Sequence, residues 1–424
     1  MNRHFNISFS SIVLSIVIVI NSAFFVSCKK KENRNLILWT DRVELISYAE
    51  LYNSLNEHQK IIVVYKENPS IDLPPAKDEE MPDVIVASWL QKKMAGKHFK
   101  DLSRIFASGS LSEEKFYPSL FDAGKKDGKQ YLIPVSFNLP ALIFSVDNYE
   151  YMHENHLLSF PQIKEISHEF NRQNKDKSYS AMGFGPTWNK DFLYFILKSN
   201  GLDYEVKENK FYYDRLKLTN IQDFIKDWTD TINGSVHSEQ DFKFRYLYTP
   251  YYKQITSGRC LFSYSTSNQI LSLPQETLDS LDFRWICNND KIIAEDDMTM
   301  MGIYSESRNH GAAQDFIIWF MSEESQKAML ERKMAMNLDT ATFGIAGGFS
   351  SIESVNERVF PVYYGALLSN IPVADYIQAP PVYPEKWKKI KENVVIPYIN
   401  DISTNANNQK PLDIRFSEWL RQNM

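Results

Sequence analysis

A chain of 424 residues in which 43% of the side chains are hydrophobic and 14% are aromatic is too apolar to be disordered. It is also too long for one ordinary hydrophobic core, so we expect two domains. The formal net charge of −6, with no basic stripe along the chain, argues against nucleic acid as a partner, because that affinity comes mostly from neutralised phosphates.

The N-terminal stretch has the layout of a secretory signal. A polar start carrying Arg3 leads into an apolar run over residues 12–26, and Cys28 follows directly before three lysines. The pattern resembles a bacterial lipoprotein signal, although Phe25 stands where leucine is usual. It predicts that residues 1–27 are removed and that Cys28 is acylated, for example by palmitate. The alternative is an uncleaved membrane helix, but the run is short for a span of roughly 20 apolar residues.

The first elements after this stretch alternate in type. Buried strands are expected at residues 36–39, 61–65 and 84–87, and apolar side chains at helical spacing predict a helix over 43–55. A proline-rich surface loop over 69–82 separates the second strand from the third. Strand, helix, strand and strand in this order is typical of an α/β domain with a mostly parallel sheet.

An almost continuous apolar run over residues 131–146 contains Pro134 and Pro140. Because proline cannot donate to a central ladder, this run predicts two strands joined by a bend, which is what a crossing between domains needs. Asp127-Gly128, just before the run, predicts a tight turn. Beyond it, helical patterns cover residues 163–171, 191–198, 221–232, 312–321 and 322–330, and strand patterns cover 260–264, 283–287 and 298–304.

Five segments of the chain are similar to motifs of a known protein family. They are LILWTD (36–41), PDVIVASW (82–89), YLIPVSFNLPALIFSVDNY (131–149), DFKFRYLYTPYYKQITSGRCLFSYST (241–266) and MTMMGIYSESRNHGAAQDFIIWFMSEESQKAML (298–330). Their order resembles that of the extracellular solute-binding lipoproteins of bacterial ABC importers, family 1, which bind mostly sugars.

The resemblance implies an α/β protein with a two-lobed periplasmic-binding-protein-like fold, each lobe a mostly parallel sheet flanked by helices, and a ligand cleft at the hinge. The expected divisions are a signal at 1–27, a tether at 28–35, an N-terminal lobe of 36–145 plus 282–322, and a C-terminal lobe of 146–281 plus 323–424. The resemblance also implies a monomer without a cofactor, lipid-anchored in the cell envelope on the extracytoplasmic side. Such a receptor would deliver a small solute, with sugar favoured, to an ABC permease.

Polar or aromatic residues just past an apolar run are the candidates for the ligand site, because ligands lie beyond the carboxyl ends of strands in open α/β sheets. The candidates are Asp41, Trp89, Asn138, Trp188, Tyr264, Thr266 and Asp297. Carboxylates and amides could bind sugar hydroxyls, and indole faces could stack on a sugar ring. Structural interpretations stay open beside these: a helix N-cap for Asp41, packing between lobes for Trp89 and a turn for Asn138.

Two other functions stay open, a secreted carbohydrate-active hydrolase and a surface lipoprotein without a ligand. The chain contains no GxSxG, HExxH or CxxC motif, so we expect a protein that is not an enzyme. His153 and His156 are three residues apart but have no third ligand nearby, so no metal site is predicted. Cys260 and Cys287 could pair outside the cytoplasm, but their strand-like surroundings favour two buried thiols.

Overall fold

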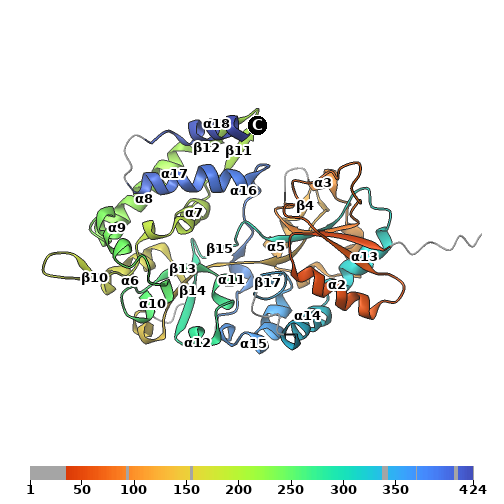
Figure 1. Cartoon of the computed structure of the whole chain (residues 1–424), viewed down its shortest axis with the longest axis horizontal. Helices are drawn as coiled ribbons and strands as arrows, with labels where there is room; N and C mark the ends of the chain where they lie inside the picture. The colour runs from red at the N-terminus through yellow and green to blue at the C-terminus, as the bar shows by residue number, and fades with distance from the viewer. Residues whose placement is uncertain are drawn as a thin grey trace, which may run out of the picture.

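The computed structural model describes residues 35–91, 95–152, 156–336, 342–368, 370–404 and 409–423. These residues form two bodies that lie side by side, each built around its own sheet, with a few segments running between them (Figure 1). The expected lipidation site Cys28 and the histidine His153 lie outside the described residues. Within the described part of the chain, no helix combines the length and the apolar character needed to cross a bilayer.

The first sheet has the strand order β17-β6-β16-β3-β1-β2. Its strands are β1 (Leu36–Thr40), β2 (Ile61–Tyr65), β3 (Val84–Ser88), β6 (Ile133–Phe137), β16 (Thr299–Ile303) and β17 (Phe349–Ser350). The strands predicted at the start of the chain are confirmed, and β1 pairs in parallel with both β2 and β3. β16 comes from far along the chain and lies between β3 and β6, antiparallel to both.

Helices cover the first sheet, and their apolar faces pack on it to form the core of this lobe. They are α2 (Glu44–Leu55), α3 (Ala95–His98), α4 (Ser103–Ala107), α5 (Pro118–Asp122), α13 (His310–Phe320), α14 (Glu323–Ala335) and α15 (Phe360–Tyr363). Tyr52 of α2 packs edge-on against Phe316 of α13 with ring centroids 5.4 Å apart. The predicted turn at Asp127-Gly128 joins β4 (Lys125–Lys126) to β5 (Lys129–Gln130), with positive φ at both turn residues.

The second sheet has the order β13-β7-β14-β8. Its strands are β7 (Pro140–Ser145), β8 (Leu157–Ser159), β13 (Ser263–Thr266) and β14 (Leu281–Cys287). Among its described strands, β14 and β8 make the parallel pair, whereas β7 is antiparallel to both of its neighbours. The sheet is therefore mixed and not mostly parallel as expected, because β7 enters its middle directly from the other lobe and runs antiparallel to its neighbours.

The second lobe is rich in helices and short hairpins. Its helices are α6 (Phe160–Phe170), α7 (Lys190–Ser199), α8 (Arg215–Ile232), α9 (Val236–Arg245), α10 (Tyr251–Thr256), α11 (Ser267–Leu271), α12 (Gln275–Leu278), α16 (Trp387–Ile390), α17 (Ile396–Ser403) and α18 (Leu412–Asn423). Its hairpins are β9 (Arg172–Gln173) with β10 (Tyr179–Ala181) and β11 (Tyr204–Lys207) with β12 (Lys210–Tyr213). The middle of α7 is apolar on every side, and the helix is buried from Phe192 to Lys198, as such segments are in large cores.

Three crossings join the lobes, and the third runs between α15 in the first lobe and α16 in the second. The run over 131–146 divides as predicted, with β6 in the first sheet and β7 in the second, and Asn138 and Leu139 between them. The return passes from β14 through β15 (Ile292–Ile293), which pairs with β18 (Ile377–Gln378), to β16.

Two segments lie elsewhere than the expected lobe divisions place them. β14 belongs to the second sheet, although residues 282–322 were expected in the N-terminal lobe. α14 and β17 pack into the core of the first sheet, although 323–424 was expected in the C-terminal lobe. Short apolar runs can fill a strand in either sheet, so the sequence pattern did not specify their partners. We propose that the lobe boundaries lie at the three crossings, near residues 138 and 295 and between α15 and α16.

Cys260 and Cys287 are both buried and unpaired, as their surroundings indicated. Burial raises the pKa of the Cys260 thiol to about 12, so this side chain stays protonated and behaves as a small apolar residue.

Candidate functional site

Asp41 ties together the ends of two strands in the first sheet. It follows β1, and its carboxylate accepts hydrogen bonds from the backbone N–H of Ser88 at 3.2 Å and from the Ser88 hydroxyl. The expected N-cap role is wrong, because α2 begins at Glu44 and its N-cap residue Val43 offers no side-chain cap. The carboxylate instead lies at the carboxyl end of β1 and β3, where ligands bind in open sheets.

Trp89 follows β3 with a φ of 62°, a left-handed conformation that is uncommon outside glycine. It is half-buried and packs against the core of the second lobe. The ammonium of Lys391, from the second lobe, lies 5.2 Å from the centroid of its ring. The geometry therefore matches the interpretation of Trp89 as packing between the lobes, through a cation–π contact.

Three consecutive acids on the returning segment point to three different parts of the molecule. Asp297 is bonded to the first lobe, because the Arg42 guanidinium donates to its carbonyl at 3.0 Å and lies 3.9 Å from its carboxylate. Glu295 accepts a hydrogen bond from the hydroxyl of Tyr264 in the second sheet at 3.3 Å. Asp296 points into the second lobe. This segment thus makes polar contacts with both lobes.

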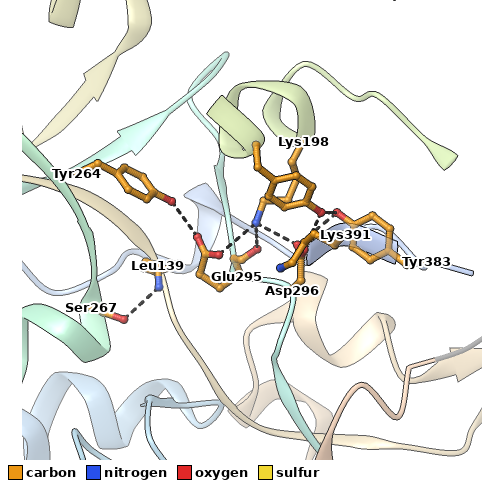
Figure 2. A network of polar contacts seen from close by, with 10 residues as sticks. Leu139, Lys198, Tyr264, Ser267, Glu295, Asp296, Tyr383 and Lys391 are labelled. Carbon is orange, nitrogen blue, oxygen red and sulfur yellow. Dashed lines mark hydrogen bonds and ion pairs between the residues drawn. The ribbon is translucent and has the colours of Figure 1, made fainter. Parts of the chain in front are cut away.

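Asp296 is the centre of a buried polar network (Figure 2). Its carboxylate accepts hydrogen bonds from Tyr194 at 2.6 Å and Tyr383 at 3.2 Å, and it pairs with Lys391 at 3.0 Å and Lys198 at 3.2 Å. The side chains of Asp296 and Lys198 are both 0% exposed. Burial would raise the pKa of Asp296, but the two lysines and Tyr194 outweigh it and hold that pKa well below its usual range.

Asn138 has a structural role at the first crossing. Its amide donates to the carbonyl of Gly347 at 2.9 Å and accepts from the hydroxyl of Ser267 at 2.6 Å, and its carbonyl accepts from the N–H of Glu295 at 2.8 Å. Asn138 therefore connects the first crossing to the segment that returns to the first lobe. Thr266, also half-buried, ends β13 opposite Pro140.

Trp188 and Tyr264 line one cavity of about 620 Å³ in the second lobe, which we call the aromatic cavity. It is lined by Phe184, Trp188, Asn189, Phe242, Lys243, Tyr246, Leu247, Tyr251, Gln254, Cys260, Phe262, Ser263, Tyr264, Ser265 and Gln269. The Trp188 ring stacks on Phe242 at 5.4 Å with a 14° interplanar angle, and its indole N–H donates to the carbonyl of Glu239 at 3.0 Å. A Cβ on Gly185 would lie 2.7 Å from this ring, so glycine is required there.

Glu239 supports the loop that carries Trp188. Its buried carboxylate accepts hydrogen bonds from the amide of Asn233 at 2.7 Å and from the N–H of Thr187 at 3.2 Å. Burial raises the pKa of Glu239 to about 7, against the hydrogen bonds from Asn233 and Thr187, which lower it.

Glu239 should make stability depend on pH. The pKa of the Glu239 carboxyl is 4.5 ordinarily and about 7 in the folded protein. Between these two pH values the carboxyl has lost its proton in the unfolded chain but keeps it in the folded protein. Raising the pH through this window should therefore destabilise the fold by roughly 2–3 kcal/mol from this group. Urea denaturation at about pH 5 and about pH 8 measures this effect. The free energy of unfolding should fall more between these pH values in the wild type than in Glu239→Gln. The same pH dependence in both proteins would contradict the assignment.

The structure brings the candidates together in two groups. Asp41, Trp89 and Asp297 lie around the first-lobe edge, and Trp188 and Tyr264 line the aromatic cavity. The sequence reasoning missed the residues between them, which are Glu295, Asp296, Lys198, Lys391, Tyr194 and Tyr383. Within the residues that the structure describes, no group of three or more His, Cys, Asp or Glu side chains is placed to hold a metal ion.

One of the missed residues did carry a sequence signal. Lys198 directly follows the apolar run Phe192–Leu197 of α7, so a buried ammonium there needed an acidic partner inside the protein. Lys391 lies among other lysines and had no such signal.

No protein-family model matches the sequence, and no curated protein matches it. Solved structures do share its fold. The sugar-binding protein MalE from the phytopathogen Xanthomonas citri is 12% identical with a TM-score of 0.61, over 92% of this chain and 96% of that one. The family 1 extracellular solute-binding protein from Alicyclobacillus acidocaldarius is 14% identical with a TM-score of 0.59, over 93% and 98%. The GacH receptor of Streptomyces glaucescens, solved unliganded and with acarbose, is 13% identical with a TM-score of 0.57, over 92% and 97%.

The fold is therefore the two-lobed fold of the extracellular solute-binding proteins, as the order of motifs implied. At these identities the likeness carries the fold, and the ligand has to be argued from this chain's own residues.

Proposed function

We propose that this chain is an extracytoplasmic receptor that binds a sugar or oligosaccharide between its two lobes and delivers it to the permease of an ABC importer. The observation that carries the proposal is the aromatic cavity, where Trp188 and Tyr264 lie beside hydroxyl and amide groups. Aromatic faces suit the apolar face of a sugar ring, and the polar groups suit its hydroxyls. Tyr264 also donates a hydrogen bond to Glu295 on the segment that returns to the first lobe, so one wall of the cavity adjoins a crossing between the lobes.

The crossings give such a receptor a way to signal that it is loaded. A ligand that touches the first-lobe edge at Asp41 and the second lobe at Tyr264 favours a closed arrangement by its higher affinity for that state. A permease can then distinguish the loaded receptor by its shape. The solved structures that share the fold are of binding proteins, which supports a receptor rather than a hydrolase.

A thermal-shift screen of the full chain in detergent tests this function. The panel contains mono- and oligosaccharides, amino acids and polyamines. We expect a sugar to raise the melting temperature, because a ligand that binds the folded state stabilises it by mass action. Turnover of a glycoside by the purified protein, or stabilisation by amino acids or polyamines alone, would contradict the proposal.

We also propose that Cys28 carries the lipid that holds the receptor in the cell envelope near its permease. The support is the apolar run that ends at this cysteine before three lysines. Mass spectrometry of the native N-terminus tests it, and an unmodified N-terminus beyond residue 28 would count against anchoring.

A further inference from the structure

A second cavity, of about 830 Å³, lies at the crossings between the lobes, and we call it the hinge cavity. One wall comes mainly from β8, β14 and β15, and the other comes from residues 368–376 of the third crossing. None of the candidate ligand residues, all of which the structure describes, belongs to its lining. A ligand there would contact two of the segments that join the lobes and would lie outside the site proposed for the sugar.

The hinge cavity has the size and the lining of a site for a small molecule. More than half of its lining residues are apolar or aromatic, among them Leu157, Trp285, Ile292, Leu368, Val373 and Tyr376. Leu368 is 71% exposed and Val373 is 54% exposed, so part of this apolar surface faces solvent. Exposed apolar groups beside a cavity mark a surface that a ligand can cover.

The charge of the lining favours a cation. Among the described residues, the lining holds the carboxylate of Asp290 and the imidazole of His156 but neither lysine nor arginine. The neighbouring Lys291 instead donates to the carbonyl of Asp375 at 2.6 Å. Burial and, after it, the Asp290 carboxylate raise the pKa of the Cys287 thiol, which also lines the cavity. The negative charge of Asp290 is therefore felt inside the cavity.

Asn370 adds a buried acceptor to the lining. Its amide nitrogen donates to Asp282 at 3.0 Å, and its backbone carbonyl accepts from the indole of Trp285 at 3.1 Å, so the side chain is fixed. Its Oδ1 is buried and accepts no hydrogen bond from a described residue. The Ser159 hydroxyl and the Gln162 amide, by contrast, bond to each other at 2.7 Å. Because a buried acceptor without a partner is costly, a ligand that donates to Oδ1 would be favoured.

We propose that the hinge cavity binds a small amphipathic cation, a primary ammonium group on an aromatic body. The Asp290 carboxylate would attract the ammonium, Asn370 Oδ1 would accept a hydrogen bond from it, and Trp285 and Tyr376 would cover the apolar body. An ammonium group has three donors and is attracted to aromatic faces. The proposal does not depend on the proposed function, because the two cavities have no lining residue in common.

Three matched probes test the class of ligand by calorimetry on the full chain in detergent at about pH 8. Tryptamine, indole-3-propionamide and indole-3-propionate share a ring and a two-carbon arm, and they differ in carrying a positive, no or a negative charge. We expect tryptamine to bind at least about fivefold more tightly than the propionate, since Asp290 attracts one and repels the other. Failure of tryptamine to bind, or equal affinities for the cation and the anion, would overturn the proposal.

Two substitutions at exposed lining residues place the probe in the hinge cavity. Asp290→Asn should weaken tryptamine about threefold and change the affinity for the propionamide less than about twofold. Asparagine tolerates the left-handed backbone at this residue, where φ is 58°, so the fold should be kept. Val373→Lys adds a cation to the lining and should weaken tryptamine and strengthen the propionate, each about threefold. Unchanged affinities in both variants would remove tryptamine from this cavity.

Val362→Lys is the matched control for Val373→Lys. It makes the same change at a 74% exposed valine of α15 that does not line the hinge cavity, and it should alter none of the three affinities. An equal effect of the two lysine substitutions would show a general effect of charge and contradict the site.

The sugar found by the thermal-shift screen separates this proposal from the proposed function. Trp188→Ala, in the aromatic cavity, should leave tryptamine binding unchanged, and the sugar should not compete with tryptamine. Competition, or loss of tryptamine binding in Trp188→Ala, would place tryptamine in the aromatic cavity and overturn the second site while the receptor stands. If no sugar binds but tryptamine responds to Asp290→Asn and Val373→Lys as expected, the proposed function fails and the hinge site stands.

Discussion

Asp296→Asn should lower the free energy of unfolding by about 3–5 kcal/mol, the cost of removing one partner from a buried ion pair. Lys198, whose side chain is 0% exposed, loses its nearer carboxylate at 3.2 Å and keeps Glu295 at 3.7 Å. Lys391 loses its partner at 3.0 Å. Urea denaturation of the full chain measures the loss.

Asp297→Asn is a matched control for this effect. It makes the same chemical change at the next residue, where the side chain is 48% exposed and the Arg42 guanidinium is 3.9 Å away. We expect it to cost less than about 1 kcal/mol, as exposed ion pairs do. Adding Lys198→Met to Asp296→Asn should recover part of the loss, because the buried ammonium has lost its nearer carboxylate and keeps Glu295 at 3.7 Å. Equal effects of the two asparagine substitutions would contradict the role of the network.

Trp188→Ala should weaken binding of the tightest glycan at least about tenfold, since truncation of a central aromatic residue usually has effects of this size. The indole supplies the ring face beside Tyr264, and it is fixed by Phe242 and by the carbonyl of Glu239. Calorimetry on the full chain measures the change. Because these contacts also hold the loop, the variant should lose roughly 1–3 kcal/mol of stability while remaining folded.

Trp419→Ala provides the comparison for Trp188→Ala. Trp419 is a half-buried tryptophan of α18 that packs on the core of the same lobe but does not line the aromatic cavity. It should change stability without changing affinity. Unchanged affinity in Trp188→Ala would remove Trp188 from the site, whatever its effect on stability.

The network at Asp296 also indicates how the lobes are held relative to each other. Asp296 lies on the segment that returns to the first sheet, and its partners come from α7 and from the residues on either side of α16. Lys391 in turn faces Trp89 of the first lobe. A single buried carboxylate thus links the hinge to the second lobe and, through one lysine, to the edge where Asp41 lies.

The sequence by itself determined the elements whose signals are local. Alternating strands and helices at the start of the chain set β1, α2, β2 and β3, because their apolar periodicity is written in consecutive residues. Pro134 and Pro140 predicted the break between β6 and β7, since proline limits where a ladder can run. The search for polar or aromatic residues beside apolar runs also identified Trp188 and Tyr264, which line the same cavity. This signal too lies in consecutive residues.

Only the tertiary structure decided which distant groups meet. Asp41 has the sequence of a helix cap, but the strand pairing brings it to Ser88, 47 residues away, and that bond replaces the cap. Lys391 and Asp296 are separated by 95 residues, and β14 has an apolar pattern that either sheet could bury. Periodicity records which side of an element is buried, whereas the partner of a buried charge or strand depends on how elements far apart in the chain pack together.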